Sequence, residues 1–68
     1  MDKELVFRNN LQSVRKSKKI SQDELAKLVG TTRQTIISIE KGIFNPSAKL
    51  ALLIAIALDV KFEDLFYF

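Results

Sequence analysis

The side chains best suited to specific binding lie in residues 33–41. If this segment is helical, its outward positions carry mostly hydrogen-bonding groups and no acidic one: Arg33, Gln34, Ile37, Ser38 and Lys41. Catalysis has no comparable group, because the chain has no Cys and no His, and so no thiol nucleophile, imidazole base or zinc-finger ligands. No motif brings carboxylates together with a nucleophile. We therefore expect a binding protein rather than an enzyme, without metal or cofactor.

Charge is unevenly distributed along the 68 residues. Between Arg8 and Lys41 there are eight basic and three acidic residues, so this part carries 8 − 3 = +5, while the two ends carry 3 − 5 = −2. A basic centre favours a face that meets a polyanion. The alternative is that Lys16, Lys18 and Lys19 only solvate a helix end.

Apolar spacing and capping residues predict four to five short helices in one all-α domain, residues 1–68. Ser21 and Glu24 form a capping box, and Gly30 ends the helix that follows it. The predicted helices span 9–19, 22–29, 33–41, 48–58 and 62–66. No apolar stretch approaches the roughly 20 residues of a membrane span, and no signal peptide opens the chain, so we expect a soluble cytoplasmic protein.

Residues 21–42 contain two short helices joined by a tight turn at Gly30, Thr31 and Thr32. This arrangement is typical of a helix-turn-helix, whose second helix enters the DNA major groove. An ordinary corner between two helices is the alternative. The basic segment and the polar outward face of residues 33–41 favour DNA binding.

The run SQDELAKLVGTTRQTIISIEKG, followed by NPS, LALLIAIALDV and FEDLF, resembles the helix-turn-helix regulators of the Cro and phage-repressor type (XRE-like). The likeness covers residues 10–66 and is strongest to minimal single-domain bacterial regulators. It implies a five-helix, lambda-repressor-like DNA-binding domain. Two departures are visible: Lys18 or Lys19 stands where relatives often carry Gly, and Lys61 replaces a usual Ser or Thr cap.

Base readers are expected in the first turns of the helix over 33–41. Arg33 can bind guanine O6 and N7, and Gln34, at a usual reading position of the family, can bind adenine N6 and N7. Ser38 lies at another such position, whereas Ile37 meets a thymine methyl group or packs beside residues 43–44. Arg33 touching only phosphate is the alternative. Phosphate contacts are expected from Ser21, Gln22, Thr32, Thr35, Lys41, Asn45 and the backbone N–H of Phe44.

Arg15 and Glu40 have a structural role if the resemblance holds. Glu40 facing DNA would repel phosphate, whereas in the family an Arg at the position of Arg15 pairs with this Glu. We therefore expect an inward ion pair.

The termini carry most of the aromatic residues. Segments 6–8 and 66–68 have the composition of a small two-stranded β-ribbon, which some minimal relatives form. The alternative is that the N-terminal segment extends the first helix.

The expected function is sequence-specific binding of double-stranded DNA, as a repressor that acts as a homodimer on a palindromic operator, with no evident small-molecule effector. An antitoxin or protein-interaction role with secondary DNA binding is the alternative. Because the helix over 48–58 is apolar all round, one side should face a partner. The expected interface is Ile54, Leu58, Phe62, Tyr67 and Phe68, although the aromatics can equally close the monomer core.

Overall fold

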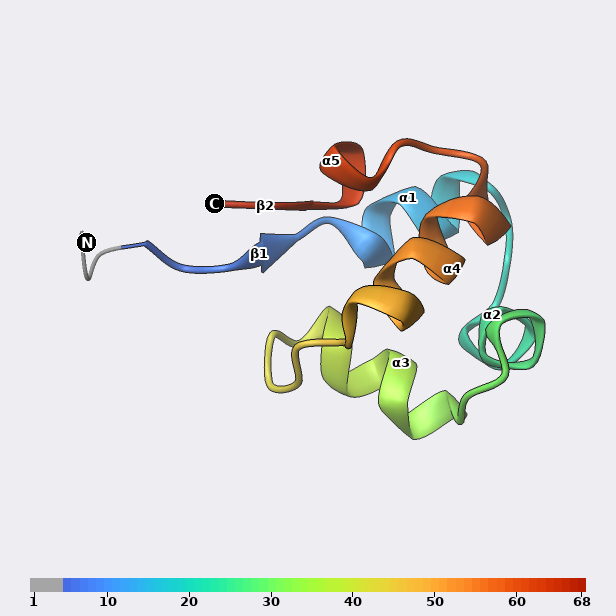
Figure 1. The fold of residues 1–68 in the computed structure, drawn as a ribbon. Helices are drawn as coiled ribbons and strands as arrows, with labels where there is room; N and C mark the ends of the chain where they lie inside the picture. Colours follow the sequence, from blue (N-terminus) through green and yellow to red (C-terminus); the bar gives the residue numbers. More distant parts are fainter. Residues whose placement is uncertain (1–4) are drawn as a thin grey trace.

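A computed structural model describes residues 5–68. In chain order its elements are β1 (Arg8–Asn9), α1 (Leu11–Ser17), α2 (Gln22–Val29), α3 (Arg33–Glu40), α4 (Ala48–Leu58), α5 (Phe62–Leu65) and β2 (Phe66–Tyr67). The helices enclose one core, and the β1–β2 ribbon projects from the bundle (Figure 1). The predicted all-α, lambda-repressor-like architecture is confirmed. In the described part of the chain, no helix is long and apolar enough to cross a membrane.

Side-chain caps fix where α2, α3 and α4 begin. The Ser21 hydroxyl accepts from the Glu24 backbone N–H at 3.0 Å, and the Glu24 carboxylate accepts from the Ser21 N–H at 3.0 Å. The Ser21 N–H and hydroxyl stabilise the charged carboxylate, and so they hold the pKa of Glu24 below its usual value. The hydroxyls of Thr32 and Ser47 accept from the Thr35 and Leu50 backbone N–H groups and so cap the next two helices. The capping residues therefore set the register of the helix-turn-helix.

The first four helices end with a residue in the left-handed conformation, namely Lys19, Gly30, Gly42 or Asp59. At the end of α1, the Ile20 N–H donates to the Arg15 carbonyl at 3.2 Å, and Lys19 N–H donates to Lys16 at 3.0 Å. Lys19 has φ +59°, whereas Lys18 has φ −87°. The residue that stands in the family's glycine position is therefore Lys19.

Lys19→Gly is expected to raise the free energy of unfolding by up to about 1 kcal/mol. A left-handed conformation costs a non-glycine residue about 1–2 kcal/mol, and glycine avoids this cost. Part of the gain is offset because glycine raises the conformational entropy of the unfolded chain. Lys18→Gly, at a right-handed position, should instead lower stability by about 0.5–1 kcal/mol. Urea titrations of both variants provide the comparison, and equal shifts would contradict the assignment.

The core contains apolar side chains from every helix. The fully buried ones are Leu11, Leu25, Ile36, Ile39, Ile54, Leu58 and Leu65. Helix α4 turns Ala51, Ile54, Ala55 and Leu58 inward and leaves Leu52, Leu53 and Ile56 exposed. The prediction that Ile54 and Leu58 form a dimer interface is therefore wrong, because these side chains are 0% and 1% exposed inside the monomer.

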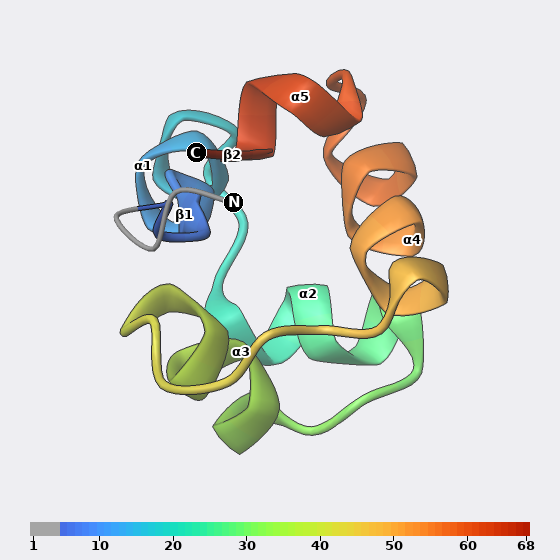
Figure 2. The ribbon, with the colours of Figure 1, turned by 60° about the vertical axis from the view of Figure 1, so that its left-hand side comes forward.

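The predicted terminal ribbon is present as an antiparallel pair in which Arg8 lies opposite Tyr67 and Asn9 opposite Phe66. Phe7 stacks on Phe66 with ring centroids 5.6 Å apart. Because Arg8 and Asn9 pair with β2, α1 begins at Leu11 rather than at residue 9. The ribbon and α4 lie on opposite sides of the bundle (Figure 2).

The C-terminal aromatics divide between the core and the surface. Phe66 is buried, and Phe62 is half-buried against the core, with its ring centroid 5.4 Å from that of Phe66. Tyr67 and Phe68 are exposed. Phe62 therefore closes the monomer core, the alternative that the sequence left open.

Candidate nucleic-acid interface

Helix α3 is held from its inner side and exposed on its outer side. Ile36 and Ile39 are completely buried, and they orient the helix against α2 and the rest of the core. Arg33 and Gln34 are exposed in the first turn, while Ile37 and Ser38 are half-buried one turn further on. Figure 2 shows α3 along the lower edge of the bundle. This helix can therefore enter a groove of DNA with Arg33 and Gln34 leading.

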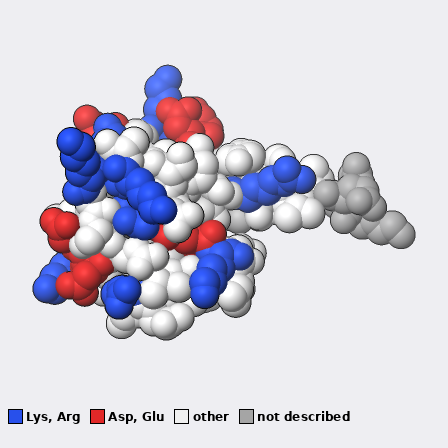
Figure 3. All heavy atoms as spheres, turned by 180° about the vertical axis from the view of Figure 1, so that it is seen from behind, with Lys and Arg blue, Asp and Glu red and all other residues white. Residues whose placement is uncertain are grey.

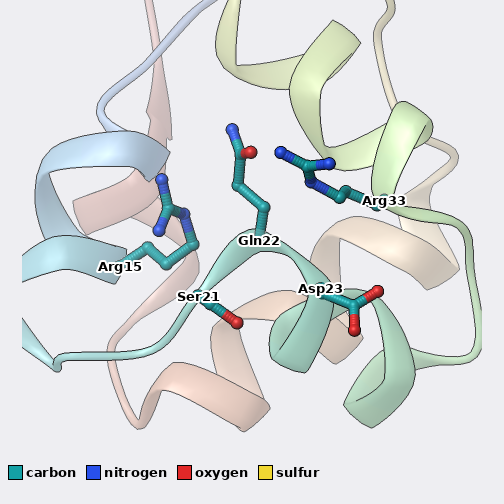
Figure 4. A pocket seen from close by; sticks show the side chains of 5 residues that line it. All are labelled: Arg15, Ser21, Gln22, Asp23 and Arg33. Atoms are coloured by element: carbon teal, nitrogen blue, oxygen red, sulfur yellow. The ribbon is translucent and has the colours of Figure 1, made fainter.

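The four predicted base readers do not lie in one cluster. Gln34 Nε2 lies 3.4 Å from Ser38 Oγ, so these two side chains share one strip of the helix. Arg33 instead lines a separate open pocket of about 500 Å³ together with Arg15, Ser21, Gln22 and Asp23. In Figure 4 the Gln22 side chain extends between the guanidinium groups of Arg15 and Arg33.

A buried polar network joins the three helices around that pocket. Arg15 Nε donates to Glu40 Oε2 at 2.7 Å, and the exposed fractions of the two side chains are 8% and 4%. Arg15 Nη1 also donates to the Ile20 carbonyl at 2.8 Å, and Gln22 Nε2 donates to Glu40 Oε1 at 3.0 Å. The predicted inward ion pair is thus present, and it connects α1 with α3.

The predicted phosphate contacts have different local surroundings. Lys41 and Asn45 are exposed. The hydroxyls of Thr32 and Thr35 lie 3.0 Å apart, so one of them donates to the other. Gln22 donates one amide hydrogen to Glu40, and its second amide hydrogen can donate to a phosphate. The Phe44 backbone N–H donates to the Ser38 carbonyl at 3.2 Å, so the predicted phosphate contact through this group has to compete with that bond.

Electrostatics at the start of α2 are mixed. Asp23 and Glu24 lie in the first turn, close to where Ser21 and Gln22 are expected to meet phosphate. Basic and acidic side chains alternate over the face shown in Figure 3 rather than forming one positive stripe. On this face, attraction of a polyanion therefore depends on individual basic side chains rather than on a uniformly positive surface.

Sequence reasoning missed Asn9, whose side chain connects the ribbon with α3. Asn9 Nδ2 donates to the Ile39 carbonyl at 2.9 Å, and Asn9 Oδ1 accepts from the Leu11 N–H at 3.1 Å. The bond to Leu11 closes an Asx turn just before α1, whose N-cap, Asn10, makes no side-chain cap bond. An Asn before a helical apolar pattern can signal such a turn, whereas nothing in the sequence indicated the contact with α3.

Comparisons with known proteins agree with this geometry. A family model described as helix-turn-helix matches residues 11–65. An HTH-type transcriptional regulator of Methanocaldococcus jannaschii is 48% identical over 62 residues, which are 91% of this chain and 94% of that protein. The HTH-type transcriptional regulator YgzD of Bacillus subtilis is 43% identical over 61 residues, which are 90% of this chain and 92% of that protein.

The restriction-modification controller protein C.AhdI of Aeromonas hydrophila shares the fold, with a TM-score of 0.75 and 35% identity over 79% of this chain and 78% of its own. These relatives point to a DNA-binding regulator and not to an enzyme. The chain belongs to the XRE-type helix-turn-helix family of DNA-binding transcriptional regulators.

Proposed function

We propose that this protein represses transcription as a symmetric homodimer bound to a palindromic operator. The observation that carries the proposal is the fixed presentation of α3. Its inner side chains are buried, and its first turn exposes Arg33 and Gln34, whose groups match guanine and adenine edges. An operator occupied in this way is closed to RNA polymerase.

In the bound state, Gln34 and Ser38 contact neighbouring base edges in the major groove. Arg33 contacts either an adjacent base or an adjacent phosphate. Phosphate contacts come from Ser21, Gln22, Thr32, Thr35, Lys41 and Asn45. These contacts fix the register of the helix on the duplex, and the base contacts supply the sequence preference. Ile37 is half-buried and lies one helical turn after Arg33, on the same face of α3.

The proposed dimer contact is the exposed side of α4. Leu52, Leu53 and Ile56 are 51%, 36% and 74% exposed, and all three are aliphatic. Exposed apolar groups of this kind mark an interface. In Figure 2, α4 lies at the right of the bundle and α3 at its lower left, with α2 between them, so a second copy docked on α4 leaves both recognition helices uncovered. Exposed Tyr67 and Phe68 are on the ribbon, away from this contact.

Selection of bound sites from random duplexes tests the proposal. We expect an inverted repeat whose half-site centres are about one helical turn, roughly 34 Å, apart. Recovery of a single asymmetric site would remove the symmetric dimer from the proposal, and no enrichment at all would remove specific DNA reading. A reporter transcribed across the selected site should lose activity when the protein is expressed.

Ile56→Glu is expected to convert the dimer into a monomer, because it places a charge in the centre of an apolar contact. Sedimentation at micromolar concentration should change from twice the chain mass to 7.8 kDa. Leu28→Glu is the matched control, since Leu28 is also exposed, at 64%, but lies on α2. A wild-type chain that stays monomeric on a palindromic duplex would contradict the proposal.

A further inference from the structure

A second open pocket lies on the DNA-reading side of α3 and has two chemically different walls. Its volume is about 350 Å³, and its lining residues are Thr32, Gln34, Thr35, Ser38, Ile43 and Phe44. One wall is made of hydroxyl and amide groups from α3 and its cap. The other is made of Ile43 and Phe44, which are 76% and 47% exposed.

The apolar wall is fixed to the recognition helix. The Ser38 carbonyl accepts hydrogen bonds from both the Ile43 N–H, at 3.0 Å, and the Phe44 N–H, at 3.2 Å. Gly42, with φ +75°, makes the turn that permits these bonds. The loop after α3, yellow in Figure 2, is therefore tied by two backbone hydrogen bonds to the helix that carries Gln34 and Ser38.

We propose that Ile43 and Phe44 recognise the C5-methyl group of a thymine in the A·T pair that Gln34 reads. Across the major groove, an A·T pair presents an acceptor and a donor on adenine, then the O4 acceptor and the methyl group of thymine. The pocket offers a partner for each of these groups: the Gln34 amide for adenine, the Ser38 hydroxyl, 3.4 Å from that amide, for O4, and Ile43 and Phe44, whose backbone N–H groups bond the Ser38 carbonyl, for the methyl group. This assignment rests on the proposed role of α3 as the reading helix.

Other occupants fit this pocket less well. Its lining residues include no Lys or Arg, so a phosphate at its Thr32 and Thr35 edge finds hydroxyl groups but no cation, and it leaves the Ile43 and Phe44 side unexplained. A protein partner seated here would cover Gln34 and Ser38 and compete with DNA. Ile37, the apolar residue that the sequence proposed for a thymine methyl group, is half-buried and is not among the lining residues.

Replacing thymine by deoxyuridine removes only the methyl group, and so it tests the pocket without changing the protein. Each thymine of the selected half-site is replaced in turn, and Kd is measured by fluorescence anisotropy. Loss of one buried methyl contact should raise Kd about three- to five-fold at one thymine per half-site. The same replacement should have a clearly smaller effect, below about two-fold, on the Ile43→Ser protein, which has lost the more exposed half of the apolar wall and keeps Phe44.

Leu28→Ser is the matched control, because Leu28 is exposed on α2 and does not line the pocket, so it should keep the full effect of deoxyuridine. Ile43 is exposed, so its variant should keep the wild-type far-UV spectrum. The thymine pocket alone would be overturned if deoxyuridine left Kd unchanged at every position of the selected site. It would also be overturned if deoxyuridine raised Kd as much for Ile43→Ser as for the wild type. Failure to select any site would instead overturn the proposed function on which it rests.

Discussion

Arg15→Ala is expected to lower the free energy of unfolding by about 3–5 kcal/mol, the usual loss when one partner of a buried ion pair is removed. The side chain of Glu40 is only 4% exposed, and the substitution removes the cation that pairs with it. The substitution also removes the hydrogen bond that Arg15 donates to the Ile20 carbonyl. A core of this size supplies only about 3–5 kcal/mol. The variant should therefore be largely unfolded at 25 °C, as seen by far-UV circular dichroism during urea titration.

Two controls separate this effect from a loss of charge alone. Lys27→Ala breaks the exposed pair between Lys27 and Asp23, at 3.2 Å, and should cost less than about 0.5 kcal/mol. Replacing both Arg15 and Glu40 by Met should recover at least half of the loss, because apolar replacement of a whole buried pair is often neutral. Should Arg15→Ala fold as stably as wild type and only bind DNA more weakly, Arg15 would belong to the interface.

Helix starts and stops were predictable because local chemistry determines them. Ser21, Thr32 and Ser47 cap the helices that follow, and Gly30 and Gly42 end helices in the left-handed conformation. The two partners of each of these interactions lie within a few residues of each other, so a short stretch of sequence shows both of them. The helix-turn-helix and its exposed first turn followed from that pattern.

Long-range geometry was not predictable in the same way. Helix α4 is apolar all round, so periodicity could not say which side faces inward, and Ile54 and Leu58 were placed on the wrong side. The Asn9 contact with the Ile39 carbonyl joins residues 30 positions apart. The Phe44 N–H is occupied because the chain folds back onto Ser38 after Gly42, a turn geometry that residue types alone do not specify.

The pairing of Arg15 with Glu40 was expected from the family resemblance rather than from spacing. Spacing alone offers no reason to join two residues 25 positions apart. The requirement that a buried charge be paired explains why the contact exists once the fold brings α1 and α3 together. The participation of Gln22 in that network was not foreseen, since the sequence assigned it only to phosphate.

Gln34→Ala and Arg33→Ala are each expected to cost about 1–3 kcal/mol of binding free energy on the selected site and to relax the preference at one base pair. Both side chains are exposed in the first turn of α3, so truncation removes base contacts without disturbing the core. Competition titrations against single-base variants of the site, at fixed salt, measure the two effects separately. The relaxed base pair should differ between the variants, because Gln34 adjoins Ser38 while Arg33 lines the pocket beside Gln22.

Lys41→Ala provides the contrast, because an exposed lysine at the end of α3 is proposed to meet only phosphate. It should weaken selected and unrelated duplexes alike and lower the slope of log K against log salt by about one. Base preference should remain that of the wild type. If Gln34→Ala kept the full base preference while Lys41→Ala changed it, the reading end of α3 would be its C-terminus, and the placement of this helix in the groove would have to be reversed.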